Sequence, residues 1–431
     1  MLAPFRGVRY APQRVTGLAE VTSPPYDVID TQAAERLLAS DPHNVVRLIL
    51  PRDDPDGPGR YQAAAGLIRD WLADGVLVAD PEPALYVYEE REHGGSQHRP
   101  GAGERGTVQR GLIGAVGLVP PSEGIVLPHE DVMPGPVSGR RQLMEATGAN
   151  LEPIFLLYQG DEGEAGSAAT RLVNEVADNR EPLLEAATDD GVRHRLWAVT
   201  TPAELATIAA DLAPRQALIA DGHHRYAAYR EVQAGRRQGG PWDYGLALLV
   251  DATAFPPRID PIHRVLPGFA ASAAVELAKS AFSVRPLPAG TGLDRALAAL
   301  AGAGAHGPAF LLAADGQFHL LTDPDPVQLD EAMPPGRSRR WRGLDTSVLH
   351  QLLIRSVWRL PDDERTVRMV HHDAAAAIEA AHPDGTAVIC NPAPVADVLA
   401  IAAGGETVPR KSTSFGPKPR TGLVIRTFAD S

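Results

Sequence analysis

Apolar and polar positions follow one another along the chain in blocks that predict helices and strands in alternation. Apolar residues between Tyr61 and Leu72 recur at helical spacing, and Gly75 ends that segment. The runs 84–90 and 111–119 predict two strands of a long hairpin, joined by a loop at 93–106. The segment 160–190 is polar and predicts at most a helix. Further strands are expected at 153–158, 195–200, 216–220 and 244–251, and helices at 138–147, 201–212 and 223–234.

The second part of the chain repeats this alternation after a proline-rich run. Residues 255–269 predict a domain junction, because prolines interrupt both helices and strands there. Beyond it, helices are expected near 271–281, 292–303, 345–358 and 394–402, and strands at 308–314, 317–322, 366–371 and 386–390. Strands that alternate with helices are typical of the α/β class. We therefore expect two α/β domains, an N-terminal domain over 1–265 and a C-terminal domain over 266–431.

The helix at 201–212 carries a capping signal at its start. Thr201 stands at the N-cap position, and Glu204, three residues later, completes a predicted capping box. Asp373 similarly precedes an Ala-rich helix and is expected to cap it.

Composition narrows the classes of function. With 54 acidic and 41 basic side chains the net charge is −13, which argues against a broad nucleic-acid or anionic-membrane surface. The N-terminus has no signal-peptide pattern and no apolar run approaches the roughly 20 residues of a membrane span. We therefore expect a cytoplasmic protein that binds no membrane. Cys390 is the only cysteine, so no disulfide is expected, and the apolar run around it predicts a buried strand thiol.

Several segments resemble known motifs but lack features that the corresponding sites require. Both matches to GxGxxG, at 101–106 and 302–307, lack the preceding strand and following helix of a dinucleotide site, and we interpret them as glycine-rich turns. The segment 405–412 approaches a P-loop, but Arg410 replaces its second glycine. His129 and Glu130 begin like a zincin HExxH motif, but Met133 occupies the position of the second histidine.

The segment from Asp221 to Arg225 joins a predicted buried strand to a predicted helix. The first N–H groups of that helix favour an anion, and Gly222 lets the backbone approach a ligand. Arg225 offers a planar fork for phosphate oxygens, while His223 and His224 can donate to them or move a proton. Asp221 can orient a histidine or hold Mg²⁺ with waters. The alternative is an ordinary helix start that Asp221 caps, with both histidines in polar niches of the core.

The N-terminal segment supplies candidates for substrate binding. Pro24 and Pro25 make a rigid turn, because each proline fixes its own φ and the second restricts the first. This turn either ends a strand or holds Tyr26 and Asp27 at a substrate, with Asp27 binding an amino group. Arg6 lies on the same segment and is a candidate for a substrate carboxylate.

The C-terminal segment is dense in hydrogen-bond donors. Lys411, Ser412, Thr413 and Lys418 are candidates for contacts to an anion. Such tails are usually solvated, but the strand-like run 422–428 that follows predicts an anchored one. Lys411 and Lys418 can then close over a polyphosphate.

Two resemblances follow from these motifs. The segment 221–226 is similar to the phosphate-binding motif of the ParB/sulfiredoxin-like superfamily, in particular its free-serine kinase branch, where an earlier glutamate of a Pro-His-Glu segment is the catalytic base. Pro128, His129 and Glu130 match that segment, although an insertion must separate the two motifs. Over nearly its whole length the chain also resembles a prokaryotic family of domains of unknown function. That resemblance rests on Pro4–Gly7, Pro24–Ile29, Pro128–Glu130, Asp221–Tyr226, Lys411–Thr413, Phe415, Pro417–Lys418 and Thr421–Gly422.

The resemblance implies a ParB/sulfiredoxin-like phosphate-binding domain, with its core at about 110–250, and a small-molecule phosphotransferase. The best hypothesis is a free L-serine kinase that uses ATP, ADP or pyrophosphate with Mg²⁺ and has no structural metal. Its partners are a phosphate donor and a hydroxyl acceptor, without nucleic acid. The implied catalytic residues are Glu130, His223 and Asp221; the phosphate-binding residues are Gly222, His223, His224, Arg225, Lys411, Ser412, Thr413 and Lys418; the substrate-binding residues are Arg6, Tyr26, Asp27 and His129.

Two other functions stay open from the sequence. One is a non-catalytic nucleotide-binding regulator of the ParB-like kind. The other is a metal-dependent hydrolase built on His129, His223, His224 and His371.

Overall fold

The computed structural model describes residues 1–53, 59–92, 107–163, 166–237, 239–314, 316–363 and 365–429. The predicted loop at 93–106, with its GxGxxG match, lies outside these residues. The chain forms two compact units. Unit 1 comprises Met1–Pro128, Val132–Pro256 and Pro417–Ser431, and unit 2 comprises His129–Asp131 and Pro257–Gly416. The division therefore falls at Pro256, within the predicted junction 255–269 and before the expected domain boundary at residue 265, and the last segment of the chain returns to unit 1.

The main sheet of unit 1 contains nine strands among the described residues. Strand β1 (Leu2–Ala3) pairs with β5 off the main path. In spatial order the other strands are β6 (Val126–Leu127), β11 (Ala217–Asp221), β8 (Ile154–Tyr158), β12 (Tyr244–Asp251), β5 (Val108–Gly117), β4 (Leu85–Glu92), β10 (Val192–Val199) and β9 (Leu184–Ala187). The predicted hairpin is present, since β4 and β5 are antiparallel neighbours.

Strand directions fix which side chains meet at each edge of this sheet. β8 runs parallel to β12 and antiparallel to β11. Asp221, the last residue of β11, therefore lies opposite Phe155 near the start of β8, while Ala217 at its beginning lies opposite Tyr158 at the end of β8. The two ends of β11 thus belong to opposite edges of the sheet.

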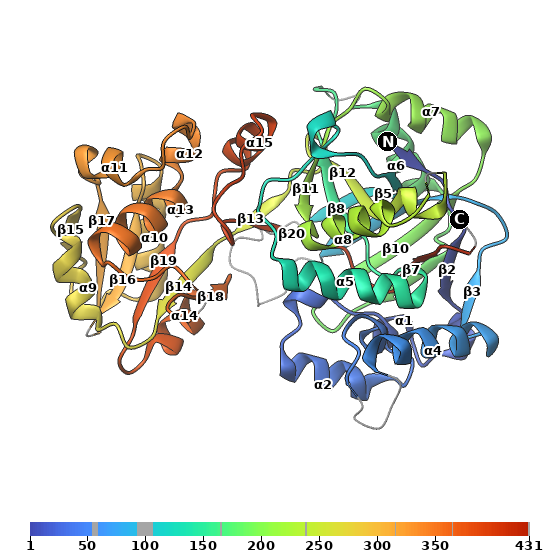
Figure 1. The fold of residues 1–431 in the computed structure, drawn as a ribbon, viewed down its shortest axis with the longest axis horizontal. Helices are drawn as coiled ribbons and strands as arrows, with labels where there is room; N and C mark the ends of the chain where they lie inside the picture. The colour runs from blue at the N-terminus through green and yellow to red at the C-terminus, as the bar shows by residue number, and fades with distance from the viewer. Residues whose placement is uncertain are drawn as a thin grey trace. The chain divides into compact units, whose positions relative to one another are not determined.

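Helices of unit 1 pack in two groups. α5 (Pro134–Thr147) packs against α8 (His223–Ala234) and α4 (Arg60–Ala73), and α6 (Ala168–Asn179) packs against α7 (Pro202–Leu212) (Figure 1). α6 buries Leu172, Val173 and Val176 at helical spacing in the core that the main sheet forms. The shorter helical segments of unit 1 are Pro12–Arg14, α1 (Leu18–Val21), Tyr26–Val28, α2 (Thr31–Ser40), α3 (Val46–Ile49), Pro121–Glu123 and Pro241–Asp243.

A second, four-stranded sheet of unit 1 joins the two ends of the chain. Its order is β3 (Leu77–Ala79), β2 (Gly7–Tyr10), β21 (Ile425–Thr427) and β7 (Ala149–Asn150) within the described residues. Gly7 lies opposite Arg426, so the first and last parts of the chain are hydrogen-bonded neighbours. The C-terminal segment is therefore anchored, as the run 422–428 predicted.

Unit 2 is a second α/β unit. Its six-stranded sheet, counted over the described residues, has the order β15 (Ser283–Pro286), β17 (Gln317–Thr322), β16 (Phe310–Ala314), β19 (Thr386–Cys390), β14 (Ile262–Leu266) and β18 (Arg368–His371), and β13 (Arg258–Asp260) pairs with β20 (Ser414–Gly416). Its helices are α9 (Ala271–Ala278), α10 (Leu293–Gly304), α11 (Pro326–Ala332), α12 (Arg339–Gly343), α13 (Asp345–Val348), the π-helical segment Leu349–Val357, α14 (Ala374–Ala381) and α15 (Val395–Ala403).

Most predicted elements are present, and the α/β class is confirmed. The capping box at α7 is wrong: the Thr201 side chain accepts no helix N–H, and Glu204 instead pairs with Arg180. Asp373 does cap α14, because its carboxylate accepts the N–H of Ala376. Cys390 is a buried strand thiol, as predicted.

Two local predictions were incomplete. Within 160–190 the sequence suggested at most a helix, whereas the structure has α6 followed by the strand β9. The predicted junction 255–269 contains the strands β13 and β14. No helix in the described part of the chain is long and apolar enough to cross a membrane.

Candidate functional site

Gly222 shapes the turn between β11 and α8. Its φ of 94° lies in the left-handed region, which glycine adopts at little cost. A Cβ at this position would lie 2.8 Å from Cγ2 of Ile154 and 3.1 Å from Nε of Arg225, so a larger residue would have to displace a neighbour. The N-cap glycine also has no side chain that could cover the first turn of α8. The turn therefore sets the carboxylate of Asp221 beside a helix N-terminus, where the dipole favours anions.

Asp221 is bound by two cations of unit 1. Its Oδ2 accepts a hydrogen bond from Nη2 of Arg225, four residues later in the chain. Its Oδ1 accepts one from Nζ of Lys418 at 2.5 Å, and the same ammonium lies 3.3 Å from Oδ2 of Asp27. The structure thus brings together four of the residues that the sequence selected, from three distant parts of the chain.

The charges of this group stabilise one another. Burial by itself would raise the pKa of Asp221, but Lys418 and Arg225 hold that pKa below its ordinary value. Burial by itself would lower the pKa of Lys418, but Asp221 and Asp27 raise it above its ordinary value. Both side chains are therefore ionised at neutral pH.

Arg225 is almost completely buried, with 2% of its surface exposed. Nη1 donates to the carbonyl oxygen of Pro153 at 2.6 Å, in addition to the bond from Nη2 to Asp221. Its Nε–H is buried and has no hydrogen-bond partner within the described residues. The guanidinium carbon lies 5.9 Å from the centre of the Tyr26 ring. An anion bound here would therefore share Arg225 with Asp221.

Two residues beside this group were not predicted from the sequence. Oε1 of Glu152 accepts the backbone N–H of Tyr26 at 3.0 Å, and Oε2 lies 3.6 Å from Nη1 of Arg140. The Arg140 guanidinium lies over the Tyr26 ring, 4.2 Å from its centre. Arg140, Glu152 and Arg225 also line one small pocket. No motif marks Arg140 in the middle of α5 or Glu152 in a short connection.

Burial determines the direction of the pKa shift of both Glu152 and Tyr26. It raises the pKa of Glu152 above its ordinary value, although Arg225 and Arg140 oppose the shift. It also raises the pKa of Tyr26 to about 12, so the phenol stays neutral and keeps its proton as a donor.

The two histidines begin α8. His223 is 7% exposed and is the first residue of the helix. Nε2 of His224 accepts the backbone N–H of Met133 at 3.1 Å. This bond requires an unprotonated Nε2, so a neutral His224 carries its proton on Nδ1.

Arg6, another candidate of unit 1, donates to the carbonyl oxygen of Pro81, in the connection before β4.

The remaining candidates belong to unit 2 and contact one another there. Oε1 of Glu130 accepts the backbone N–H of Lys411. Nε2 of His129 lies 2.8 Å from Oγ1 of Thr413, and the hydroxyl of Ser412 donates to the carbonyl oxygen of Pro409. The Pro-His-Glu segment and the Lys-Ser-Thr segment, about 280 residues apart in the sequence, are therefore neighbours in the fold.

One residue of this second group was missed. Arg264 of β14 is completely buried, and its Nη2 donates to the carbonyl oxygen of Lys411 at 2.8 Å. Glu130 and Arg264 thus bind the N–H and the carbonyl of the same residue. Lys411 has a φ of 55°, an uncommon value for a residue with a side chain, so these bonds help to hold it.

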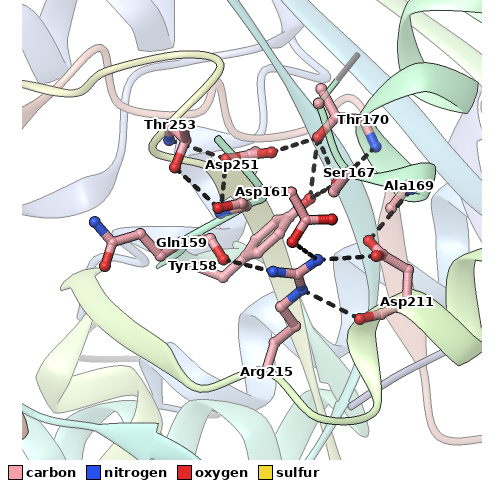
Figure 2. Close-up of polar contacts among 12 residues, drawn as sticks. Tyr158, Gln159, Asp161, Ser167, Ala169, Thr170, Asp211, Arg215, Asp251 and Thr253 are labelled. Atoms are coloured by element: carbon pink, nitrogen blue, oxygen red, sulfur yellow. Dashed lines mark hydrogen bonds and ion pairs between the residues drawn. The ribbon is translucent and has the colours of Figure 1, made fainter. Parts of the chain in front are cut away.

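The opposite end of β11 carries another Asp–Arg pair. Nη2 of Arg215 lies 2.9 Å from Oδ1 of Asp211 and 3.0 Å from Oδ1 of Asp161, and Nη1 donates to the carbonyl oxygen of Gln159 at 3.0 Å. Figure 2 shows this pair beside the ring of Tyr158, at the end of β8. The guanidinium ties α7 to the chain that follows β8.

Asp251 completes the polar group at that edge. Its carboxylate accepts bonds from Oγ1 of Thr170 at 2.5 Å and from the backbone N–H groups of Gly160 at 3.0 Å and Thr253 at 2.9 Å (Figure 2). Each of these partners lies in a connection or at a helix start. The group therefore fixes loops at the ends of β8 and β12.

Sequence comparison assigns the chain to a family. The profile of DUF1015, described as a protein of unknown function, matches residues 2–347. The chain belongs to the DUF1015 family. The matched part of this DUF1015 chain includes Asp27, Glu130 and the segment from Asp221 to Arg225, and it ends before Lys411 and Lys418. No curated protein sequence matches the chain.

Three solved structures are among those to which this chain is similar. A free serine kinase in complex with AMP is 15% identical, with 73% of this chain and 91% of that chain covered and a TM-score of 0.38. SbnI with a C-terminal truncation, from Staphylococcus aureus, is 10% identical over 74% and 88%, with a TM-score of 0.36. A conserved hypothetical protein from Pyrococcus furiosus is 14% identical over 74% and 96%, with a TM-score of 0.36.

The candidate metal ligands of the hydrolase hypothesis do not form one group in either unit. His223 and His224 belong to unit 1, whereas His129 and His371 belong to unit 2. Across the described ranges, no three or more His, Cys, Asp or Glu residues are arranged to hold a metal ion. A smaller ligand set, such as Asp27 with Asp221, would need water or a bound phosphate to complete it.

Proposed function

We propose that the protein is a small-molecule phosphotransferase that binds its phosphate donor in unit 1, at the turn from β11 to α8. The observation that carries this proposal is the arrangement of two cations, Arg225 and Lys418, around Asp221 at the N-terminus of α8. A helix N-terminus with an arginine fork and an ammonium beside it is suited to phosphate oxygens. The same segment carries the sequence resemblance to a phosphate-binding motif.

The proposed reaction transfers a phosphoryl group to a hydroxyl. The hydroxyl oxygen forms a bond to phosphorus, the bond from phosphorus to the leaving phosphate oxygen breaks, and a carboxylate takes the hydroxyl proton. Glu130 is the proposed base, with Asp221 and His223 as further catalytic residues. Arg225, Lys418 and the first turn of α8 neutralise the phosphate charge, and Mg²⁺, when bound with the donor, adds to this. Lys411, Ser412 and Thr413 stay predicted phosphate contacts.

Free L-serine is the proposed acceptor. Asp27 binds an ammonium group in this structure, that of Lys418, and an α-amino group is a cation of the same kind. Tyr26 is fixed beside Asp27, because Glu152 binds its backbone N–H and Arg140 covers its ring. A rigid carboxylate and a neutral phenol can together select a small amine that carries a hydroxyl. Arg6 and His129 stay predicted substrate contacts.

The test is a phosphorus NMR assay of the full chain with L-serine, Mg²⁺ and ATP, ADP or pyrophosphate in turn. We expect a phosphomonoester signal with at least one donor. Glu130→Gln should abolish that signal and leave donor binding intact, because it removes a proton acceptor and keeps the shape. Glu123→Gln, at an exposed carboxylate seven residues earlier, is the matched control and should keep full turnover. No turnover with any donor contradicts the proposal, and full turnover in Glu130→Gln contradicts the base assignment.

Two further measurements, DNA binding and metal analysis, separate the other two functions. Nucleotide binding without turnover, together with tight and salt-sensitive binding of DNA, would favour the ParB-like regulator. Stoichiometric zinc or iron in the purified protein would favour the hydrolase.

A further inference from the structure

Lys418 is one of the few lysines in a chain whose basic residues are mostly arginines. Only three of its 41 basic residues are lysines, namely Lys279, Lys411 and Lys418. An ammonium is a compact point charge that can approach two carboxylates at once, whereas a guanidinium is a planar fork. Lys418 uses that property, since its Nζ lies 2.5 Å from Asp221 and 3.3 Å from Asp27. The pair of carboxylates is therefore a position for a small cation, and in this structure the cation is part of the chain.

The same two carboxylates suit a divalent cation that arrives with a phosphate donor. Mg²⁺ in such sites is typically held by one or two carboxylates, with waters and phosphate oxygens in the other positions. Asp221 and Oδ2 of Asp27, the oxygen that faces Lys418, would supply the carboxylate ligands, and Oδ1 of Asp27 would remain for the amino group of the acceptor. Their side chains are 28% and 10% exposed, so the position is open to solvent on the side of Asp27. Lys418 and a divalent cation cannot both occupy it, because their positive charges repel.

The backbone on both sides of Lys418 is fixed, while its side chain ends in a partly open site. The carbonyl oxygen of Pro417 accepts a bond from Nε2 of Gln109 at 3.0 Å. Arg420 donates to Oγ1 of Thr22 at 2.6 Å through Nε, and to the hydroxyl of Tyr88 through its backbone N–H. A change of partners by the ammonium would therefore come from rotation of the side chain and not from movement of the C-terminal segment.

We propose that Lys418 is an internal counter-ion that, together with Arg225, neutralises Asp27 and Asp221 when no ligand is bound, and that the divalent cation of the donor displaces it. On displacement its ammonium turns from the carboxylates to the phosphate oxygens. The two carboxylates thus face a cation both without and with the ligand. This inference rests on the proposed function and adds an exchange between two cations at the same position.

The test is equilibrium binding of Mn²⁺ alone to the full chain, followed by the EPR signal of the free ion. Lys418→Met removes the competing ammonium and should tighten Mn²⁺ binding by about ten-fold or more, since a unit charge is removed within a few ångströms. Lys279→Met, at an exposed lysine of unit 2, is the matched control and should bind Mn²⁺ like the wild type. Equal Mn²⁺ affinity in Lys418→Met and the wild type would overturn the proposal.

A second variant keeps the inference testable if Lys418→Met does not fold. Asp27→Asn, in the one-turn helix after Pro25, should weaken Mn²⁺ binding by about ten-fold relative to the wild type. If Lys418→Met does fold, adding Asp27→Asn to it should reverse its gain in Mn²⁺ affinity. Unchanged Mn²⁺ affinity in Asp27→Asn would overturn the assignment of the ligands. Because these measurements involve no turnover, they separate the two proposals. Tighter Mn²⁺ binding without any phosphoserine refutes the transferase alone, and turnover without an effect of Lys418→Met refutes the exchange alone.

Discussion

An aspartate and an arginine four residues apart lie near each end of β11, and the two pairs differ in the further charged residues that join them. At the start of the strand, Asp211 and Arg215 bind one another and the connection that follows β8. At its end, Asp221 and Arg225 bind one another too, but Lys418 joins them and Nε of Arg225 has no partner in the described part of the chain. The first pair is complete as it stands, and the second is part of a larger charged group.

The difference shows what distinguishes a structural pair from a candidate site. Around Arg215 the acceptors are Asp211 of α7 and the carbonyl and carboxylate oxygens of Gln159 and Asp161 after β8, and these bonds fix the chain (Figure 2). Around Arg225 two further charged residues, Lys418 and Asp27, come from distant parts of the sequence. Gathering buried charges is costly for folding, and such groups are common at functional sites. Spacing alone does not separate the two pairs, whereas their partners do.

The largest expected effect comes from the aspartates of the two pairs. Asp221→Asn should lower phosphotransfer by about 100-fold or more, because it disturbs both cations that face the phosphate. Asp211→Asn should keep turnover within about two-fold and lower the free energy of unfolding by about 1 kcal/mol, as for a partly exposed ion pair. Initial rates by phosphorus NMR and urea unfolding of both variants measure this. Equal losses of turnover would remove the distinction between the two ends of β11.

A second pair of variants compares glycines near the same two ends. Gly222 and Gly124 both have positive φ, but a Cβ would lie 2.8 Å from Ile154 at Gly222 and 3.5 Å from Gln216 at Gly124. Both substitutions by alanine should cost about 1 kcal/mol for the left-handed backbone. Gly222→Ala should cost about 2 kcal/mol more, because the core must move to admit the methyl group. Denaturant unfolding measures both, and equal costs would mean that the turn has more room than the structure shows.

The smallest effect is a difference in pH dependence. The lowered pKa of Asp221 stabilises the fold above about pH 4, and this contribution is lost as the pH falls through the folded pKa. The raised pKa of Lys418 stabilises the fold below about pH 10, and that contribution is lost as the pH rises through the folded pKa. The stability difference between wild type and Lys418→Met should therefore be largest between these limits and shrink on both sides.

The pair at the other end supplies the control for this profile. Arg215 stays protonated at any accessible alkaline pH, so Asp211→Asn should show no alkaline decrease in its stability difference. Unfolding free energies over the acid, neutral and alkaline range decide the point. An alkaline decrease in both variants would show that it does not come from Lys418.

Elements with a clear apolar period were predictable from the sequence. The helical period from Tyr61 to Leu72 is α4, the strand 216–220 is β11, and the run 223–234 is α8, because each signal is local. β9 was missed since its residues follow a polar helix and alternate over only four positions. The capping box failed because Arg180, distant in the sequence, competes for Glu204.

The candidate site was predictable only where a motif marks it. The segment from Asp221 to Arg225 stands out by its composition, and Lys418 by its place in a donor-rich tail. Glu152, Arg140 and Arg264 carry no such mark, because their positions follow from the packing of α5 and β14 and from long-range contacts. The sequence also could not show that Glu130 and Lys411 are bonded to one another within unit 2.

The most direct test of the account is equilibrium binding of ADP to the full chain by calorimetry, with Arg225→Met compared with Arg215→Met. The two variants lose the same side chain at opposite ends of one strand. We predict that ADP binds to the wild type and to Arg215→Met with similar affinity, and at least about 100-fold more weakly to Arg225→Met, as expected for the loss of a charged donor to phosphate. Unchanged affinity in folded Arg225→Met would contradict the claim that the turn from β11 to α8 binds the phosphate donor.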